Sequence, residues 1–150
     1  MEEIAFLVGR WAGEGAGEYP SVEPFSYGEE VTFSHVGKPY LAYTQRSWDL
    51  TDGRPLHAEM GYWRCPAPGE LEVLVAHPNG HVEISLGSLR GNDVTLSSSS
   101  VLAAPTAKDV TTLVRRIWVN GDHMRYELEM QAVGIALVPH LRGVLERVAH

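Results

Sequence analysis

The sequence predicts an all-β fold, an antiparallel up-and-down barrel of about ten strands, and three observations support this prediction. Apolar and polar residues alternate in short segments, which is the pattern of half-buried strands. Turn residues separate these segments at intervals of roughly 8–12 residues. Near the end of the chain, Asn120 and Gly121 join two such segments, and Asn-Gly is the preferred pair for a tight β-hairpin turn.

The hairpin around Asn120 and Gly121 shows the alternation most clearly. Its arms are residues 111–119 and 123–132, and the second arm has one apolar and one polar face. The apolar face carries Met124, Tyr126, Leu128, Met130 and Ala132, and the polar face carries His123, Arg125, Glu127, Glu129 and Gln131. We therefore expect the apolar face to line the interior of the fold and the polar face to meet water.

Seven further predicted strands precede this hairpin, and one follows it. In order along the chain they are residues 11–15, 29–35, 40–48, 58–64, 71–76, 82–86 and 94–101, then the two hairpin arms, then a last strand from His140. Turn residues separate the segments at residues 36–39, 51–55, 66–69, 78–80 and 91–93. Only residues 2–8 and a short turn near residues 21–25 have a pattern that suits a helix.

Ten meandering strands in a chain of 150 residues favour closure of the sheet. Closure removes the exposed sheet edges, and a barrel of this size can enclose one small ligand. A β-sandwich is the structural alternative. The length suits one domain that covers residues 1–150.

Composition and charge exclude several classes of function. The 12 basic and 19 acidic residues give a formal charge of −7, which repels a phosphate backbone, so nucleic acid is not expected as a partner. Cys65 is the only cysteine, so neither an internal disulfide nor a zinc site built from several cysteines is available. An acidic start and the lack of a long apolar run argue against a signal peptide and a membrane helix, and we expect a cytoplasmic protein.

The seven histidines are the main candidates for metal or cofactor chemistry, and none belongs to an HExxH motif. His77 and His81 flank a Pro-Asn-Gly turn and could approach each other, but two turn histidines without a third ligand are more typical of a solvated surface. His140 follows the uncharged residues 132–139, and Pro139 restrains the backbone before it. The residues alone leave His140 open to two interpretations, a hydrogen-bonded core histidine or a single axial ligand of haem iron.

The run GRWAGEG at residues 9–15 surrounds a tryptophan with glycines in the first predicted strand. We interpret Trp11 as a plug at the bottom of the barrel, with Gly13 and Gly15 allowing a bend or a close backbone approach. A glycine-tryptophan opening also occurs in lipocalin-like barrels, so this run argues for the architecture and not for a particular ligand.

Three segments form a specific pattern through their order and spacing. The first holds GxWxGxG, GEYPS and FSYGEE between residues 9 and 30. The second is AKDV at residues 107–110, and the third is MQAVG leading to PHL at residues 130–141. Taken together, these segments resemble nitrobindin, a family of haem-binding β-barrels related in shape to fatty-acid-binding proteins. The resemblance spans nearly the whole chain.

The resemblance implies one haem b per chain, with His140 as the axial ligand of the iron. It also implies that Lys108 lies near the haem, and that Ser21, which follows the Tyr-Pro pair, does so too. Met130 would then form part of an apolar haem wall, and His77 would approach the open side of the iron. The GxWxGxG motif is interpreted as barrel scaffold and not as a haem contact.

The same resemblance implies a function. With one axial histidine, ferric iron keeps its sixth position open for a small ligand, and related proteins are credited with binding nitric oxide and isomerising peroxynitrite to nitrate. We therefore expect a haem-dependent peroxynitrite isomerase that scavenges reactive nitrogen species, and a homodimer is one assembly open to it.

Two alternatives remain open at this point. One is a lipocalin-like carrier of a fatty acid or another small apolar ligand, which would need no haem and could bind a carboxylate through Arg46, Arg116 or Arg125. The other is an interaction domain with a filled barrel and no ligand.

Overall fold

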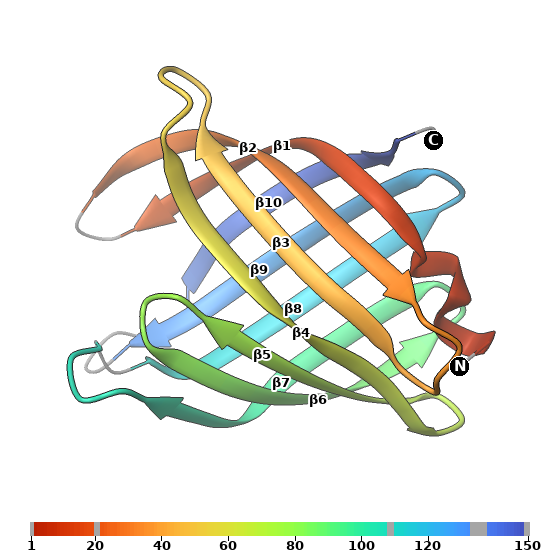
Figure 1. Ribbon diagram of the computed structural model, residues 1–150. Helices are drawn as coiled ribbons and strands as arrows, with labels where there is room; N and C mark the ends of the chain where they lie inside the picture. Colours follow the sequence, from red (N-terminus) through yellow and green to blue (C-terminus); the bar gives the residue numbers. More distant parts are fainter. Residues whose placement is uncertain (1, 20–21, 108–109, 133–137, 149–150) are drawn as a thin grey trace.

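Ten antiparallel strands close into a barrel in the computed structural model, and one short 3-10 helix precedes them (Figure 1). The structure describes residues 2–19, 22–107, 110–132 and 138–148. Within these ranges only the backbone is described at residues 19, 22, 110, 111, 131, 132 and 138–140. The elements are η1 (Glu2–Leu7), β1 (Gly9–Tyr19), β2 (Val22–His35), β3 (Leu41–Asp49), β4 (Pro55–Ala67), β5 (Glu70–His77), β6 (His81–Arg90), β7 (Asp93–Ala103), β8 (Val110–Asn120), β9 (His123–Ala132) and β10 (Val138–Arg147).

The barrel has up-and-down topology, because each strand pairs with its neighbours in sequence and β1 pairs with β10 to close the sheet. Ten strands and full closure confirm the predicted fold class, and the sandwich alternative is wrong. Successive connections alternate between the two ends of such a barrel. We call the end that holds η1 the near end, and the opposite end, where β1–β2, β3–β4, β5–β6, β7–β8 and β9–β10 are connected, the far end (Figure 1).

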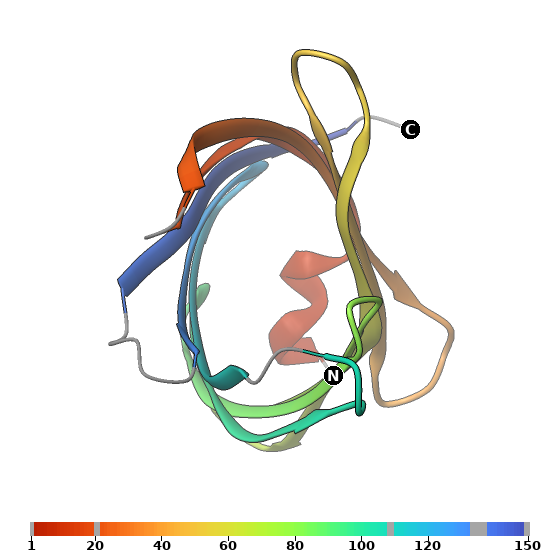
Figure 2. The same cartoon turned by 90° about the vertical axis from the view of Figure 1, so that its left-hand side faces the viewer.

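Helix η1 closes the near end, and Figure 2 shows it at the back of the barrel when the molecule is viewed from the far end. Ile4 and Leu7 of this helix and Trp11 of β1 are fully buried. The indole Nε1 of Trp11 donates a hydrogen bond to the carbonyl oxygen of Leu7 at 2.9 Å. The prediction that Trp11 plugs the barrel is therefore confirmed, and the helix predicted at residues 2–8 is present as η1.

The helical turn predicted near residues 21–25 is wrong, because β2 begins at Val22 and runs without a break to His35. Pairing with β1 explains the strand: Gly17 lies opposite Phe25, and Gly15 lies opposite Tyr27. A Cβ atom on Gly15 would come within 2.4 Å of the Tyr27 ring. The glycines of the GxWxGxG motif thus leave room for aromatic rings from β2. This pairing cannot be predicted from the sequence of residues 21–25 alone.

No helix among the described residues is long and apolar enough to cross a membrane.

Candidate functional site

The far end of the barrel gathers the strand ends that flank the predicted site residues (Figure 2). His77 is the last residue of β5, and His140 is the third residue of β10. Ser21 falls between β1 and β2, and Lys108 falls between β7 and β8; both lie outside the described residues. The β1–β2, β5–β6, β7–β8 and β9–β10 connections all lie at the far end, so the topology brings the strand ends beside these four predicted residues to the same end of the barrel.

The backbone of His140 belongs to a strand and not to the last loop. Pro139 pairs with Glu129, whereas Leu141 pairs with Leu128, so the register shifts across His140. His140 is the extra residue of a β-bulge, a feature that redirects side chains and is common beside functional sites. The side chain of His140 lies outside the described part of the chain.

Large apolar side chains near the far end are only half-buried, although they lie on the inward face. Met130 is two positions beyond Leu128 on the inward face of β9, as the alternation predicted. Leu141 lies across from Leu128 on β10, and Phe25 is half-buried on β2. Nearer to η1, the inward side chains of Met124 on β9 and Leu145 on β10 are buried. The described chain therefore leaves an apolar surface partly uncovered toward the far end.

A buried ionic network crosses the barrel between the apolar core and the far end. Arg115 of β8 donates from Nη1 to Oε1 of Glu59 on β4 at 2.8 Å, and from Nη2 to Oε1 of Glu83 on β6. Tyr43 donates to the same Oε1 of Glu59 at 2.6 Å, and Ser85 donates to Oε2 of Glu83 at 2.7 Å. The side chain of Arg115 is 13% exposed, and those of Glu59 and Glu83 are 5% and 0% exposed.

Both carboxylates of this network are ionised at neutral pH. Burial by itself would raise the pKa of Glu59 and of Glu83, but the charge of Arg115 and the hydrogen bonds outweigh it and hold each pKa below its ordinary value. Burial acts to lower the pKa of Arg115, and the two carboxylates outweigh that effect and raise it. Two anions and one cation leave the network with one excess negative charge, which favours a further cation nearby.

Glu29, a second buried carboxyl group, has the opposite character. Burial raises its pKa to about 7, although hydrogen bonds from Tyr126 and Gln45 act to lower it. Nε2 of Gln45 lies 2.6 Å from Oε2 of Glu29, and the hydroxyl groups of Tyr126 and Tyr27 lie 2.5 Å apart. Glu29 therefore holds and releases a proton near neutral pH inside the barrel.

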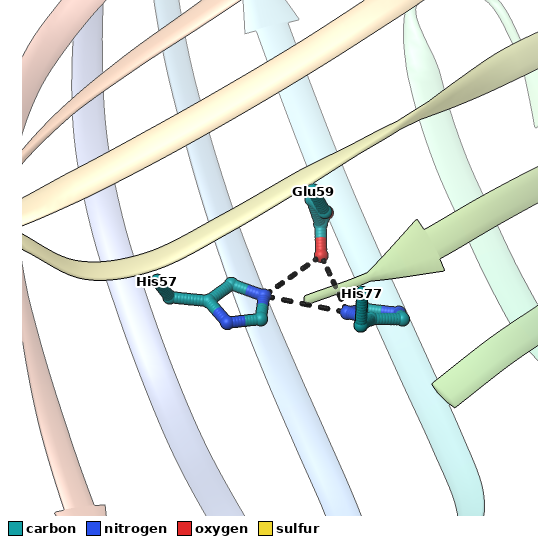
Figure 3. Close-up of side chains that lie close together, drawn as sticks. All are labelled: His57, Glu59 and His77. Carbon is teal, nitrogen blue, oxygen red and sulfur yellow. Dashed lines mark hydrogen bonds and ion pairs between the residues drawn. The ribbon is translucent and has the colours of Figure 1, made fainter. Parts of the chain in front are cut away.

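Two histidines, His57 and His77, meet Glu59 of the ionic network on the inward face (Figure 3). Nε2 of His57 and Nδ1 of His77 each lie 3.3 Å from Oε2 of Glu59, and the two nitrogens are 3.3 Å apart. Nε2 of His77 is 2.7 Å from Oε1 of Glu83. Two imidazole nitrogens and one carboxylate oxygen form a donor set that suits a divalent transition-metal ion.

His57 and Glu59 were not predicted as site residues from the sequence, and His77 and His81 were expected to be solvated. His77 has a side chain only 9% exposed, and His81 is buried with Nδ1 3.0 Å from Oδ1 of Asn79. The expectation that these two histidines are solvated is therefore wrong. The signal for the missed pair was the spacing of His57 and Glu59, which places both on one face of a strand. Their meeting with His77 depends on strand register, which the spacing does not predict.

The three arginines considered for a carboxylate ligand lie on the outer face of the barrel. Arg46 binds Glu30, and Arg116 binds Glu129. The guanidinium carbon of Arg125 lies 4.2 Å from the centre of the Trp118 ring. Arg115, which was not considered, points into the barrel, and its charge is already offset by two carboxylates.

The closed barrel, with a partly uncovered apolar surface and buried ionisable groups toward one end, defines a β-barrel protein that binds a small ligand inside. Residues 1–147 match the family model described as "THAP4-like, heme-binding beta-barrel domain". The chain belongs to this family, the nitrobindin family, which confirms the resemblance found in the sequence.

Curated relatives match the chain over nearly its whole length. Peroxynitrite isomerase 2 of Mycobacterium avium is 50% identical, and the match covers 98% of this chain and 94% of the relative. Peroxynitrite isomerase 1 of Mycobacterium tuberculosis is 47% identical with the same coverage. The crystal structure of Rv2717c from M. tuberculosis has a TM-score of 0.92 and 46% identity over 99% of this chain and 96% of that chain.

Proposed function

We propose that this chain binds one haem b at the far end of the barrel and isomerises peroxynitrite to nitrate. The observation that carries the proposal is the family match over residues 1–147, with relatives named peroxynitrite isomerase at 47–50% identity. We also propose that residues 1–150 form one domain, because the family match spans nearly all of them.

The apolar surface near the far end suits a flat, largely apolar cofactor. Phe25, Leu128, Met130 and Leu141 are half-buried on the inward face, and burial of apolar area contributes about 25 cal/mol per Å². A haem lying against Met130 would cover part of that surface. The fit supports Met130 as a wall residue of the haem site.

His140 is the proposed axial ligand, through one nitrogen of a neutral imidazole. Haem with a single protein ligand supplies an iron centre that can bind nitric oxide or peroxynitrite. Lys108 would form an ion pair with a haem carboxylate, worth about 1 kcal/mol or less at the surface. Ser21 and His77 complete the proposed haem surroundings, with His77 toward the open side of the iron.

Haem titration tests the ligand. Haemin added to the purified chain should give a sharpened Soret band that saturates at one haem per chain, and His140→Ala should abolish the band of the ligated form. His123→Ala is the matched control, because His123 is exposed on the outer face of β9. An unchanged haem affinity and spectrum in His140→Ala would overturn the axial assignment.

Catalysis needs a separate measurement. Peroxynitrite decay, followed by stopped-flow absorbance, should accelerate in proportion to the ferric haem-loaded protein and yield nitrate. The haem-free chain and the His140→Ala variant should leave the decay at its rate in buffer. Haem binding without acceleration would reduce the function to binding, with nitric oxide as the ligand to examine next.

Two further expectations rest on general features of the chain. We expect a cytoplasmic location, as the composition indicated. We also expect a homodimer, and the outer face of β4, β5, β6 and β7 supports it because apolar side chains are exposed there. They are Met60, Tyr62, Leu74, Val82, Ile84, Leu86 and Leu102.

The haem-free carrier is less well supported. A fatty-acid carrier would need an inward cation for the carboxylate, and Arg46, Arg116 and Arg125 lie on the outer face. No observation on the described residues favours that function over haem binding.

A further inference from the structure

We propose that the chain binds a zinc ion inside the barrel through His57, Glu59 and His77. The site shares His77 with the proposed haem surroundings, but His57, Glu59 and the proposed axial ligand His140 are not shared between the two sites. The zinc ion goes beyond the proposed isomerase function. The three side chains come from β4 and β5 and converge on one point (Figure 3).

The spacing of the three donor atoms fits a tetrahedral metal ion. Nε2 of His57, Oε2 of Glu59 and Nδ1 of His77 form a triangle with edges of 3.3, 3.3 and 3.3 Å. A tetrahedral zinc ion with ligand distances of about 2.0–2.1 Å separates its donor atoms by about 3.3–3.4 Å. An octahedral ion at the same distances would need edges nearer to about 2.9 Å. The triangle therefore matches one face of a zinc tetrahedron.

His77 lies between two carboxylates, with one ring nitrogen facing each of them. Nε2 of His77 is 2.7 Å from Oε1 of Glu83, and Nδ1 is 3.3 Å from Oε2 of Glu59. Nδ1 also lies 3.3 Å from Nε2 of His57. A metal ion at the centre of the triangle would accept one lone pair from each of the three donor atoms.

The groups around the three ligands resemble the outer shell of a zinc site. The carboxylate of Glu83 orients His77 from behind, an arrangement that fixes the tautomer of metal-bound histidines. Tyr43 and Arg115 both donate to Oε1 of Glu59, which leaves Oε2 free to face the histidines. The excess negative charge of the ionic network favours a dication over a neutral occupant.

The site also has a route of entry and an open position. The side chain of His57 is 34% exposed, whereas those of Glu59 and His77 are 5% and 9% exposed. A zinc ion held by three protein ligands keeps its fourth position for water or another small ligand. The proposed ion is therefore of the open, reactive kind and not a closed structural site.

Metal binding to the tag-free chain tests the proposal. Equilibrium dialysis against Zn²⁺ with metal analysis should give one zinc per chain, and His57→Ala should weaken binding at least 100-fold. His35→Ala is the control, because His35 is exposed and outside the triangle. Co²⁺ in place of Zn²⁺ should give the strong visible absorption of a tetrahedral site.

Variants separate this proposal from the haem proposal. His140→Ala should retain stoichiometric zinc, and His57→Ala should retain the haem Soret band and an unchanged thermal unfolding midpoint. Glu83→Gln should weaken zinc binding by about 10- to 100-fold by releasing the orientation of His77. Failure to bind one equivalent of zinc, or equal binding by the wild type and the His57→Ala/His77→Ala double variant, would overturn the metal site.

Discussion

Arg115 of β8 and Glu59 of β4 meet inside the barrel, with Nη1 of the arginine 2.8 Å from Oε1 of the glutamate. The two strands are not neighbours in the sheet, so this contact crosses the interior. It joins the ionic network to the triangle of His57, Glu59 and His77 through a single carboxylate. Glu59 thus links the buried charges to every group proposed to hold a metal ion.

Replacing Arg115 with Met should destabilise the fold strongly. The change leaves Glu59 and Glu83 buried without their cation, and removal of one partner of a buried ion pair costs about 3–5 kcal/mol. Urea unfolding at pH 7 measures the loss. Arg116→Met is the control, because its surface pair with Glu129 should cost less than about 1 kcal/mol. Equal losses in the two variants would contradict the importance of the network.

Glu29 should make stability fall as the pH rises through neutrality. Its pKa is raised by burial to about 7 in the folded protein, so the folded state holds this proton more tightly than the unfolded state, whose carboxyl group has a pKa of about 4.3. The contribution to stability is full below the unfolded pKa and is lost by the time the pH passes the folded one. From pH 5 to pH 8 the loss should reach about 2–3 kcal/mol.

Glu29→Gln removes this titration and serves as the comparison. The difference in unfolding free energy between the wild type and Glu29→Gln, measured in urea at half-unit steps, should shrink or change sign from pH 5 to pH 8. Parallel curves for the two proteins would show that Glu29 titrates at its ordinary pKa in the folded state.

Gly143 should tolerate a methyl group poorly because of Tyr126. A Cβ atom on Gly143 would come within 2.4 Å of the Tyr126 ring, and crowding of a packed interior costs about 1–3 kcal/mol. Thermal and urea unfolding of Gly143→Ala measure the cost. In a Tyr126→Ala background the same substitution should cost much less, and a double-mutant cycle reports the difference. Additive costs would mean that the two residues do not compete for space.

The outer face of β6 and β7 should decide the assembly state. Val82 and Leu102 are paired across these strands and are 51% and 69% exposed. Light scattering coupled to size exclusion should find twice the mass of one chain for the wild type and a monomer for Val82→Glu. Val144→Glu is the matched control, because Val144 is 60% exposed on β10, outside that face. A monomeric wild type would exclude the homodimer.

Lys108→Ala should loosen the haem without removing its ligation. An exposed ion pair is worth about 1 kcal/mol or less, so transfer of haem to an acceptor protein should accelerate by roughly fivefold at most. The spectrum of the ligated haem should stay unchanged. Loss of that spectrum would assign Lys108 a role beyond the predicted ion pair.

The sequence by itself determined the approximate number of strands and their order, and it favoured closure of the barrel over a β-sandwich. Alternation with period two and tight turns are local properties, and short connections between strands leave up-and-down pairing as the natural topology. The burial of Trp11 and the inward direction of the apolar face of β9 were predicted from the same local patterns. The helical turn near residues 21–25 failed because pairing with glycines of β1 overrode the local preference.

The tertiary structure alone decided which polar side chains meet inside. Glu59, His77 and Arg115 come from three strands, and their contacts depend on register and on closure across the barrel. A register shift of one residue in any of these strands would turn its side chain to the outer face. The spacing of residues within one strand therefore does not predict these contacts between strands. The same reason explains why Arg115 faces inward whereas its neighbour Arg116 faces outward.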